Sequence, residues 1–316
     1  MIPVLVLAGA LLAETRLRLP NALHPVAWLG SAAAALIARA PLAPKWRALL
    51  AGTAIALIVP AGVFLLARVA LSALQPLPWA RAALQVLMLY VSVCLFGLLS
   101  AARDVRSALA SGDVELGRSR LGALCSRDPS ALDSVGLANG TIASLAENLT
   151  DAVVAPLCAL LLFGVEGALA YRAINTLDAM IGYRGRYEWL GKAAARLDDV
   201  VNLLPARIAA LVLFAAGASM QKTSLARGAR IWWRDRRLTP SPNGGHPMAM
   251  TAGLLGVRID KPASYALGPE LDAPRPPDIA RAMVLVRRAG LLSFALALLG
   301  VDLLGLGGLW GLDVGR

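Results

Sequence analysis

Long apolar runs, interrupted by polar side chains at helical spacing, constrain the fold of this chain more than any other feature. Residues 48–66 and 82–102 both reach the roughly 20 residues that a membrane-spanning helix needs. Charged residues make up only 16% of the 316 positions, whereas soluble proteins carry about a quarter. Because a helix satisfies its own backbone hydrogen bonds inside a bilayer, these runs predict an all-α, polytopic membrane bundle. We expect the whole chain, 1–316, to form a single membrane domain.

Other segments extend this prediction. Residues 1–13 lack the basic start and the cleavage site of a secretory signal, so we expect a retained helix there. A further apolar run covers 26–38, and the run 289–310 predicts a last spanning helix. Interleaved charges and leucines predict a surface helix over 103–127. Residues 222–237 are basic and contain two tryptophans, a composition that is typical of a membrane interface.

Two apolar runs are short, and they bear on the topology. Residues 152–165 and 208–220 are shorter than a span, and runs of this length are more often re-entrant or buried in protein. Because basic loops mark the cytoplasmic side, we expect 103–135, 184–202 and 238–277 to face the cytoplasm. The last of these is a polar loop region rich in Pro and Gly. The sequence therefore predicts broken or re-entrant helices that line a polar cleft open to the cytoplasm.

Several function classes find no support in the sequence. The net charge of +11 lies largely in short loops between apolar runs, which argues against nucleic-acid binding. The cysteines Cys94, Cys125 and Cys158 form no CxxC pair, so neither disulfide nor zinc chemistry is indicated. Two histidines are too few for a histidine metal site. Gly191-Lys192 resembles the end of a phosphate-binding P-loop, but the other residues of that motif are missing.

Polar residues inside apolar sequence are the strongest indication of a site. An ionisable side chain in the hydrocarbon region is disfavoured by about 2.5–3.5 kcal/mol on insertion scales. Three polar pairs recur at spacings of three or four residues and would each share one helix face. These pairs are Glu147 with Asp151, Asn175 with Asp178, and Asp198 with Asn202. They could be polar contacts that hold helices together, but we favour a buried polar site.

Several of these carboxylates are candidate ligands for Mg²⁺, which prefers carboxylate and water oxygens and often shares its shell with phosphates. One candidate set is Glu147, Asp151 and Asp178, and the Asp198-Asp199 pair is a second. The alternative is that these acids form ion pairs with the nearby arginines Arg172, Arg184, Arg196 and Arg207.

The segment from Ser241 to Gly245, SPNGG, predicts an anion site. Ser241 could cap a helix with Pro242 at its first position, or Pro247 could begin the helix after a glycine loop. Either start leaves backbone N–H groups that can bind an anion. An ordinary capped turn is the alternative. His24 precedes another expected helix, where a lone histidine is usually a cap or a packing residue.

Five stretches of the sequence together resemble one enzyme family. They read LHPVAWLG, ENLTDAVVAPL, GALAYRAINTLDAMIGYR, ARLDDVVNLLPARI and SPNGGHPMAMTAGLLGVRI. This combination is similar to the adenosylcobinamide-phosphate synthase family and covers nearly the whole chain. The resemblance implies a membrane ligase of cobalamin biosynthesis that joins adenosylcobyric acid to (R)-1-amino-2-propanol phosphate, or a close analogue, through an amide. It also implies ATP and Mg²⁺ as cofactors and a location in the lipid bilayer of the cell (inner) membrane. Other cobalamin-biosynthesis enzymes are possible partners.

The grouping of the polar residues on helix faces, together with the reaction that the resemblance implies, gives expected roles to these residues. The catalytic residues that we expect are Asp151, Asp178 and Asp199. The metal ligands that we expect are Glu147, Asp151, Asp178 and Asp198. The substrate-binding residues that we expect are His24, Asn148, Tyr171, Arg172, Asn175, Arg184, Asn202, Arg207, Ser241, Asn243, Gly244 and Gly245.

Three positions depart from the family pattern. Met248 stands where a Glu is expected, Ala152 where a Gly is usual, and Gly185 where an Asn is common. The missing Glu removes a possible metal or amine contact at position 248.

Two other functions are compatible with a polar membrane protein. A transporter of a corrinoid or a small solute would also place polar residues within the membrane. It should show internal repeats, and we find none in the sequence. A non-catalytic assembly partner would not need the dense group of Asp, Asn and Arg residues.

Overall fold

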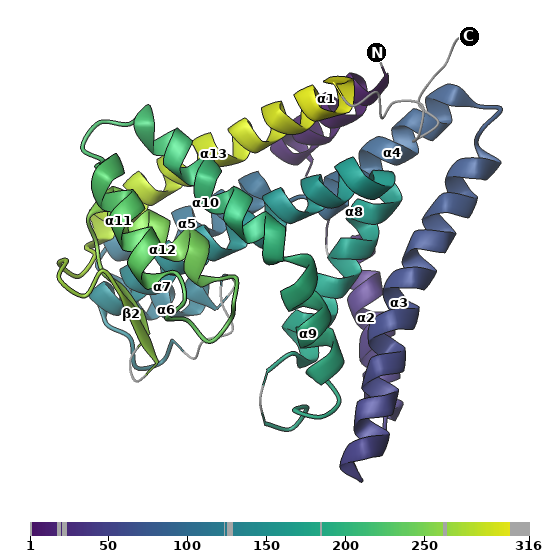
Figure 1. Cartoon of the computed structure of the whole chain (residues 1–316), viewed down its shortest axis with the longest axis horizontal. Coiled ribbons are helices and arrows are strands. Elements are labelled where there is room, and N and C mark those ends of the chain that lie inside the picture. The colour runs from purple at the N-terminus through teal and green to yellow at the C-terminus, as the bar shows by residue number, and fades with distance from the viewer. Residues whose placement is uncertain are drawn as a thin grey trace. The chain divides into compact units, whose positions relative to one another are not determined.

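The computed structural model describes residues 2–17, 20, 24–122, 124, 129–183, 185–261 and 264–303. Within them the chain is almost entirely helical, and the strands form one short hairpin. This confirms the all-α prediction. The helices form two compact units (Figure 1). Unit 1 comprises Met1–Val93, Ala155–Asn202 and Leu296–Arg316, and unit 2 comprises Cys94–Val154 and Leu203–Ala295. That both units form a single membrane domain stays a prediction.

Unit 1 places two helices that carry polar residues, α8 and α9, against the long helix α3. Its helices are α1 (Ile2–Arg16), α2 (Pro25–Arg39), α3 (Lys45–Ala73), α4 (Pro78–Ser92), α8 (Ala155–Ile181) and α9 (Lys192–Val201), together with the end of α13 (Pro276–Leu303). Helices α2, α8 and α9 all contact α3 (Figure 1), and α1 packs on α4. The core between them consists of small and branched apolar side chains: Ala33, Ile37, Ala56, Leu177, Ile181, Leu190 and Ala194. This core fixes α8 and α9 side by side.

Unit 2 surrounds one buried helix, α12 (Gly245–Leu255). Every residue of α12 is buried, which fits a sequence that is apolar on all sides. It packs against α7 (Ser134–Leu149), α10 (Leu203–Ala218) and α11 (Leu225–Asp235). The other elements of unit 2 are α5 (Leu95–Ala110), α6 (Val114–Leu121), the π-helix η2 (Thr150–Val154), β1 (Ile259–Lys261), β2 (Tyr265–Leu267) and the first part of α13. The two strands are antiparallel, with Ile259 opposite Leu267, and the hairpin contacts α7 and α12.

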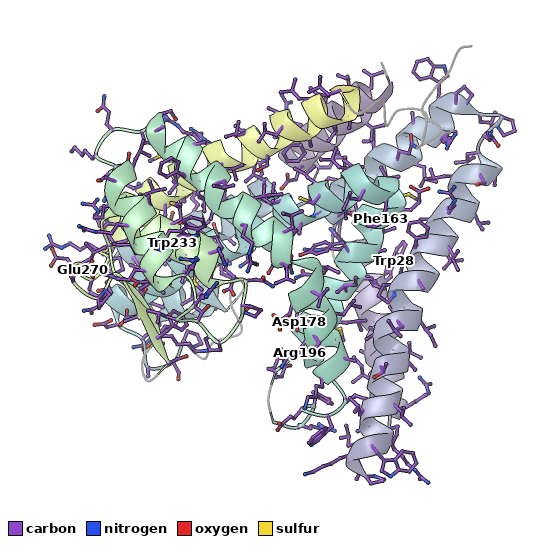
Figure 2. The ribbon with its side chains drawn as sticks, viewed as in Figure 1. Trp28, Phe163, Asp178, Arg196, Trp233 and Glu270 are labelled. Atoms are coloured by element: carbon purple, nitrogen blue, oxygen red, sulfur yellow. The ribbon has the colours of Figure 1, made fainter. Side chains whose placement is uncertain are left out.

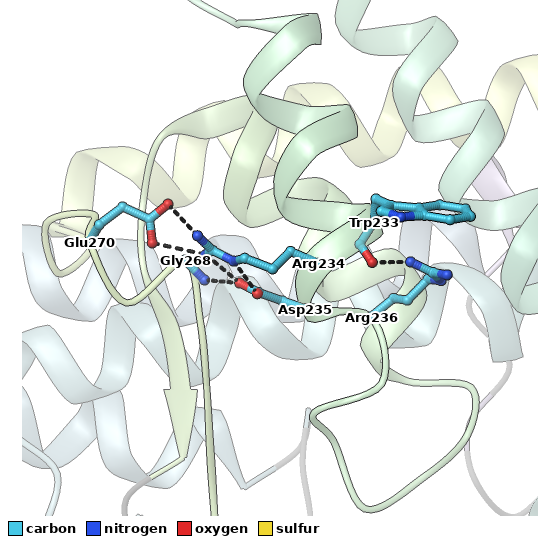
Figure 3. A network of polar contacts seen from close by, with 6 residues as sticks. All are labelled: Trp233, Arg234, Asp235, Arg236, Gly268 and Glu270. Carbon is cyan, nitrogen blue, oxygen red and sulfur yellow. Dashed lines mark hydrogen bonds and ion pairs between the residues drawn. The ribbon is translucent and has the colours of Figure 1, made fainter.

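A polar network ties α11 to the segment after β2 (Figure 3). Asp235 is 2% exposed, and its carboxylate accepts hydrogen bonds from Arg234 Nε at 2.5 Å and from the Gly268 N–H at 2.7 Å. Arg234 also pairs with Glu270 at 2.9 Å, and this hydrogen bond holds the pKa of Glu270 below its usual range. Because the buried carboxylate is paired and hydrogen-bonded, its burial leaves no uncompensated charge. The network therefore fixes the end of the hairpin next to α11.

Four segments of the described residues are long and apolar enough to cross a membrane. They are Lys45–Ala73, Pro78–Ala110, Ser134–Ile181 and Pro276–Val301. A fifth crossing is obtained if α9 and α10 together form one bent span. The chain is therefore a polytopic membrane protein by length and composition, as predicted.

Two expected helices are divided differently in the structure. The run 82–102, predicted as one helix, breaks at Cys94, where non-helical backbone separates α4 from α5. The Cys94 N–H donates instead to the Ala152 carbonyl at 2.8 Å. Residues 103–110, which were expected to begin a surface helix, continue α5. Asp113 then caps the separate helix α6 by accepting a hydrogen bond from the Leu116 N–H. Part of the expected surface helix beyond residue 122 lies outside the described residues.

The short run 152–165 and the expected loop 238–277 also need correction. The short run is continuous with its neighbours through η2, so that the whole series Ser134–Ile181 is long enough to cross. The series is kinked at Gly164, whose φ of 75° suits a residue without a Cβ atom. The expected loop contains α12 and the hairpin, because its apolar stretch forms a buried helix rather than a surface connection.

Three further expected helices are present. The run 1–13 forms α1, and the run 208–220 lies mostly in α10. Helix α13 begins at Pro276, earlier than the predicted start at 289, because polar residues extend it. The Asp278 carboxylate lies in its first turn, where it accepts a hydrogen bond from the Arg275 N–H at 2.9 Å. Residues 304–310 of the predicted last helix lie outside the described residues.

Candidate functional site

The first polar region lies in unit 1, on and beside helices α8 and α9. We call it the carboxylate cluster, and its members are Tyr171, Arg172, Asn175, Asp178, Asp198, Asp199 and Asn202. Figure 2 labels Asp178 on α8 and the neighbouring Arg196 on α9. Asp198 interacts electrostatically with both Asp178 and Asp199. Like charges gathered on apolar helices are unfavourable unless a cation or a proton compensates them.

One carboxylate oxygen of Asp198 accepts a hydrogen bond, and the other has no hydrogen-bond partner among the described residues. The Tyr171 hydroxyl donates to Asn202 Oδ1 at 3.0 Å, and Asn202 Nδ2 donates to Asp198 Oδ2 at 2.9 Å. Because the tyrosine occupies the amide oxygen, the NH₂ group of Asn202 is directed at the carboxylate. Asp198 Oδ1 is buried and has no hydrogen-bond partner among the described residues. A buried carboxylate oxygen in this state is unfavourable, and it points to a ligand.

Arg172 connects the cluster to the start of α2. Its guanidinium donates to Asn175 Oδ1 at 3.4 Å, and the Asn175 side chain interacts with Asp198. Burial, together with the charge of Arg172, lowers the pKa of His24. Nδ1 of His24 accepts a hydrogen bond from the Val26 N–H at 3.3 Å and so caps α2. His24 therefore has the capping role that was the simpler interpretation, and its role in substrate binding stays a prediction.

Asp178 and Asp199 have different surroundings. Asp199 pairs with Arg196 at 3.8 Å, as the ion-pair alternative predicted, but the Arg196 side chain is 75% exposed. Exposed pairs of this kind contribute little to stability. Asp178 lies against Gly182, where an added Cβ atom would come within 1.9 Å of Asp178 Oδ1. Glycine at position 182 therefore makes room for the carboxylate at the end of α8.

The carboxylate cluster suits a magnesium ion that is shared with a phosphate. Across the part of the chain that the structure describes, no group of three or more His, Cys, Asp and Glu side chains is arranged to hold a metal ion by itself. Mg²⁺ is usually held by one or two carboxylates, by waters and by substrate phosphates, and Asp198 Oδ1 fits such a donor. The other predicted set is divided between the units, with Glu147 and Asp151 in unit 2 and Asp178 in unit 1. Both metal sets stay predictions.

The second polar region is a cavity of about 330 Å³ in unit 2, which we call the polar pocket. Its lining comes from α7, α12, the turn before α12 and the hairpin: Gly140, Ala143, Ser144, Glu147, Thr239, Pro240, Ser241, Gly244, Met248, Lys261 and Tyr265. Asn139 holds the hairpin against α7, since its Nδ2 donates to the Asp260 carbonyl at 2.6 Å and to Asp260 Oδ1 at 2.8 Å. This contact places Lys261 at the pocket.

The segment Ser241–Gly245 forms a turn that leads into α12. The helix begins at Gly245, so the second of the two predicted starts is the closer one. Ser241 Oγ accepts hydrogen bonds from the N–H groups of Asn243 and Gly244 at 3.2 and 3.4 Å. Arg207 donates to Asn243 Oδ1 at 3.1 Å and brings positive charge to the turn. The start of α12 adds further partial positive charge.

His246 lies in the first turn of α12, and the nearby positive charges affect its pKa. Burial and, to a lesser extent, the charges of Arg207, Arg236 and Arg237 together lower the pKa of His246 to about 4. The Trp232 Nε1–H group donates to His246 Nδ1 at 3.3 Å, which requires an unprotonated nitrogen there. The electrostatics of this helix start therefore favour an anion over a cation.

The two glycines of the turn meet different neighbours. A Cβ atom on Gly245 would lie 2.3 Å from the Arg236 carbonyl oxygen and 2.8 Å from Thr239 Oγ1. At Gly244 the nearest atom would be Glu147 Oε1, at 2.7 Å, which is the end of a movable side chain. Gly245 is therefore required for backbone packing, whereas Gly244 borders a carboxylate of the pocket.

Comparisons with known proteins now place both regions in one family. The chain matches the family described as CobD/Cbib protein over residues 7–286. It belongs to the CobD/Cbib family. The family resemblance expected from the motifs is thereby confirmed, and the carboxylate cluster and the polar pocket both lie within the matched residues.

Relatives of this family member match over most of their lengths. The Cobalamin biosynthesis protein CobD of Chromobacterium violaceum is 40% identical over 320 residues, which cover 96% of this chain and 97% of that protein. The protein of the same name from Dehalococcoides mccartyi is 37% identical over 278 residues, or 86% and 88% of the two chains. Its counterpart in Rhodobacter capsulatus is 38% identical over 280 residues, or 84% and 85%. No solved structure matches this CobD/Cbib family member.

The predicted site residues of this family member are divided between the two units. Those in unit 1 are His24, Tyr171, Arg172, Asn175, Asp178, Asp198, Asp199 and Asn202. Those in unit 2 are Glu147, Asn148, Asp151, Arg207, Ser241, Asn243, Gly244 and Gly245. Arg184 lies outside the described residues.

Among the residues of unit 2, only some of those predicted line the polar pocket. Glu147, Ser241 and Gly244 do so. Asp151 lies in η2, and π-helical turns are frequent at functional sites. The Asn148 amide donates to the Ser144 carbonyl at 2.9 Å, within its own helix.

The residues of this region that sequence reasoning missed include His246, Lys261 and Tyr265. The Tyr265 hydroxyl donates to Met248 Sδ at 3.7 Å, so the position that departs from the family pattern also lines the pocket. Lys261 and Tyr265 come from a hairpin that the sequence did not predict, and no periodic spacing relates them to α12. The one available signal for His246 was its place directly after the SPNGG segment.

Proposed function

We propose that this protein is a ligase of cobalamin biosynthesis that forms the amide between adenosylcobyric acid and (R)-1-amino-2-propanol phosphate, or a close analogue, and consumes ATP. The names of its relatives support the pathway, because they are called cobalamin biosynthesis proteins. The motif resemblance supports the reaction. The observation that carries the proposal is the carboxylate cluster, in which the buried Asp198 Oδ1 lacks a hydrogen-bond partner among the described residues.

The reaction requires activation, because a carboxylate and an amine do not condense in water on their own. In the proposed sequence the corrinoid carboxylate attacks the terminal phosphorus of ATP, and ADP leaves. The amine nitrogen then attacks the acyl carbon, a C–N bond forms, and the C–O bond to phosphate breaks. The nitrogen must also lose a proton, and a positioned aspartate can accept it.

The carboxylate cluster supplies groups for these tasks. Mg²⁺, when bound, screens phosphate charge during the transfer, and we assign its binding to Asp198 and Asp178. The planar guanidinium of Arg172 suits a phosphate group. We assign proton transfer to Asp178 or Asp199, with Asp151 of unit 2 as the third catalytic candidate.

The turn Ser241–Gly245 is our second proposed contact with substrate. We assign it a phosphate of ATP or of the amine substrate. Arg207 supports this assignment, because it is hydrogen-bonded to Asn243 within the turn. The charges that lower the pKa of His246 support it as well, since they would also attract an anion.

We place the protein in the cell (inner) membrane, with the site open to the cytoplasm. The loop charge of 103–135 and 238–277 supports this orientation, and these two segments lie on one side if Ser134–Ile181 and the bent pair of α9 and α10 each cross once. Single cysteines in each segment, in a background without the native cysteines, should be labelled by a membrane-impermeant maleimide from the cytoplasmic side only. Labelling of 238–277 from the opposite side would overturn the orientation.

The decisive experiment is reconstitution of the reaction with the purified chain in lipid nanodiscs. We expect ADP and the amide product to form when adenosylcobyric acid, the amine phosphate, ATP and Mg²⁺ are all present. Omission of either acid or amine should abolish amide formation. Uptake of a corrinoid into sealed vesicles without amide formation would instead favour a transporter and overturn the proposal.

A further inference from the structure

The polar pocket of unit 2 carries one charged side chain of each sign. Of its lining residues, Glu147 is the one carboxylate and Lys261 the one ammonium group. They come from different elements, α7 and β1. A pocket of this kind suits a ligand that itself carries one positive and one negative group, since each end then meets an opposite charge.

The positive part of the pocket is suited to a phosphate. Ser241 and Gly244 belong to the turn before α12, whose helix start carries partial positive charge. Arg207 lies behind this turn through its hydrogen bond to Asn243. Lys261 adds a full charge at the lining itself. Phosphate oxygens accept charge-assisted hydrogen bonds from groups of this type.

Besides the two charged groups, the pocket has some apolar surface. Ala143 and Met248 line it, and the Tyr265 hydroxyl donates to the thioether sulfur of Met248 at 3.7 Å. The volume of about 330 Å³ lies at the lower end of the range for small-molecule sites. A corrinoid macrocycle is far too large for it, whereas a short amino-alkyl phosphate fits.

We propose that the polar pocket binds the amine substrate as a zwitterion, with its ammonium group against Glu147 and its phosphate against Lys261 and Ser241. This assignment rests on the proposed ligase function for the identity of the ligand. It gives Glu147 the role of ammonium partner in place of the predicted role of metal ligand. Binding of the amine is therefore independent of Mg²⁺.

The test is calorimetric titration of the full chain in nanodiscs with three probes: 1-amino-2-propanol phosphate, isopropyl phosphate and 1-amino-2-propanol. Glu147→Gln should weaken the zwitterion roughly 10- to 100-fold, the range for a charge-assisted hydrogen bond. It should leave isopropyl phosphate unchanged or more tightly bound, because a repelling carboxylate is gone. Lys261→Met should weaken both phosphates and spare the unphosphorylated amine.

Controls separate a specific effect from a folding defect. Glu115→Gln, on the exposed ion pair of α6, should change none of the three affinities. Glu147→Asp keeps the charge and should retain more of the zwitterion affinity than Glu147→Gln. Loss of binding in the presence of EDTA would mean that a metal mediates the contact, and it would overturn the proposal. Equal weakening of all three probes by Glu147→Gln would overturn it too.

The ligation assay on the same samples keeps the two proposals apart. If wild type forms the amide but Glu147→Gln and Lys261→Met leave the KM for the amine unchanged, the pocket assignment fails and the ligase proposal stands. If wild type binds the zwitterion with the predicted dependence on both side chains but forms no amide, the ligase proposal fails and the pocket assignment stands.

Discussion

The carboxylate cluster of unit 1 gathers negative charge, whereas the helix start beside the polar pocket of unit 2 gathers positive charge. In the cluster, Asp198 interacts with the carboxylates of Asp178 and Asp199, and the neighbouring amides hold only part of it. Beside the pocket, Arg207, Arg236 and Arg237 act on His246. A bound cation would stabilise the mutually repelling carboxylates, and a bound anion would stabilise the clustered arginines. The two regions are therefore suited to different ligands.

They also differ in how they are built. The cluster comes from two adjacent helices and the residue after the second, so its members recur at spacings of three or four residues within each helical segment. The pocket combines α7 with a turn, α12 and a hairpin that lie about a hundred residues further along the chain. A change in the cluster should therefore act through local chemistry. A change in the pocket acts also through the packing of the elements that form it.

The largest effect is expected in the cluster. Asp178→Asn, Asp198→Asn and Asp199→Asn should each lower amide formation, by roughly 10²–10⁴-fold where a proton-transfer group is lost, because an amide can neither accept the proton nor balance Mg²⁺ charge. The folded protein should persist in the membrane. Product formed per amount of folded protein, measured in isolated membranes, provides the test.

Two further variants sharpen this prediction. Asp104→Asn changes an exposed carboxylate of α5 and should leave turnover unchanged. Asp151→Asn tests whether η2 of unit 2 contributes to the chemistry, and we expect a loss similar to that of the cluster variants. Turnover close to wild type in all three cluster variants would reduce these aspartates to contacts between helices.

This difference in construction explains why the sequence predicted more of the cluster than of the pocket. Asn175, Asp178, Asp198 and Asn202 were found because regular helical spacing inside apolar sequence is visible without a structure. Lys261 was missed because its strand is held against α7 by contacts between residues far apart in the sequence, such as the hydrogen bond from Asn139 to Asp260, which are 121 positions apart. The division of 82–102 into α4 and α5 was missed for a similar reason. It depends on a backbone hydrogen bond from Cys94 to the distant Ala152.

The next effect in size should arise from the glycines of the pocket turn. Gly245→Val should destabilise unit 2 by about 1–3 kcal/mol, the range for overpacking, because its Cβ atom would meet the fixed Arg236 carbonyl. Gly244→Ala should preserve folding, since only the end of the Glu147 side chain must move. It should instead raise the KM for the amine phosphate more than the KM for the corrinoid. Thermal unfolding in detergent and steady-state kinetics on both variants distinguish the two outcomes. Equal losses of stability would contradict them.

A smaller effect is expected from the hydrogen bond that orients Asn202. Tyr171→Phe removes the donor to Asn202 Oδ1 and should lower stability by about 1 kcal/mol, the typical value for one hydrogen bond. Turnover should fall several-fold at an unchanged KM for the amine, because the amide no longer holds Asp198 in one orientation. Tyr183→Phe is the matched control, since that side chain is 54% exposed. An increased KM for the amine would instead connect Tyr171 to the pocket and break the division between the regions.

The smallest effect concerns the response of the two units to pH. The pKa of His246 in the folded protein is about 4, below its ordinary value of 6.5. As the pH falls from about 6.5 towards 4, the unfolded chain binds a proton at this histidine while the folded chain does not. Stability therefore decreases over this window and is fully present above it. His246→Asn keeps an acceptor for Trp232 and removes the titration. Its melting temperature should therefore decrease less between pH 7 and pH 5 than that of wild type.

His24→Asn in unit 1 should change this slope less, because burial and Arg172 lower the pKa of His24 by a smaller amount. Parallel melting curves for wild type and His246→Asn would show that the charge around α12 does not act on this histidine, and the positive surrounding inferred for the pocket turn would lose its support.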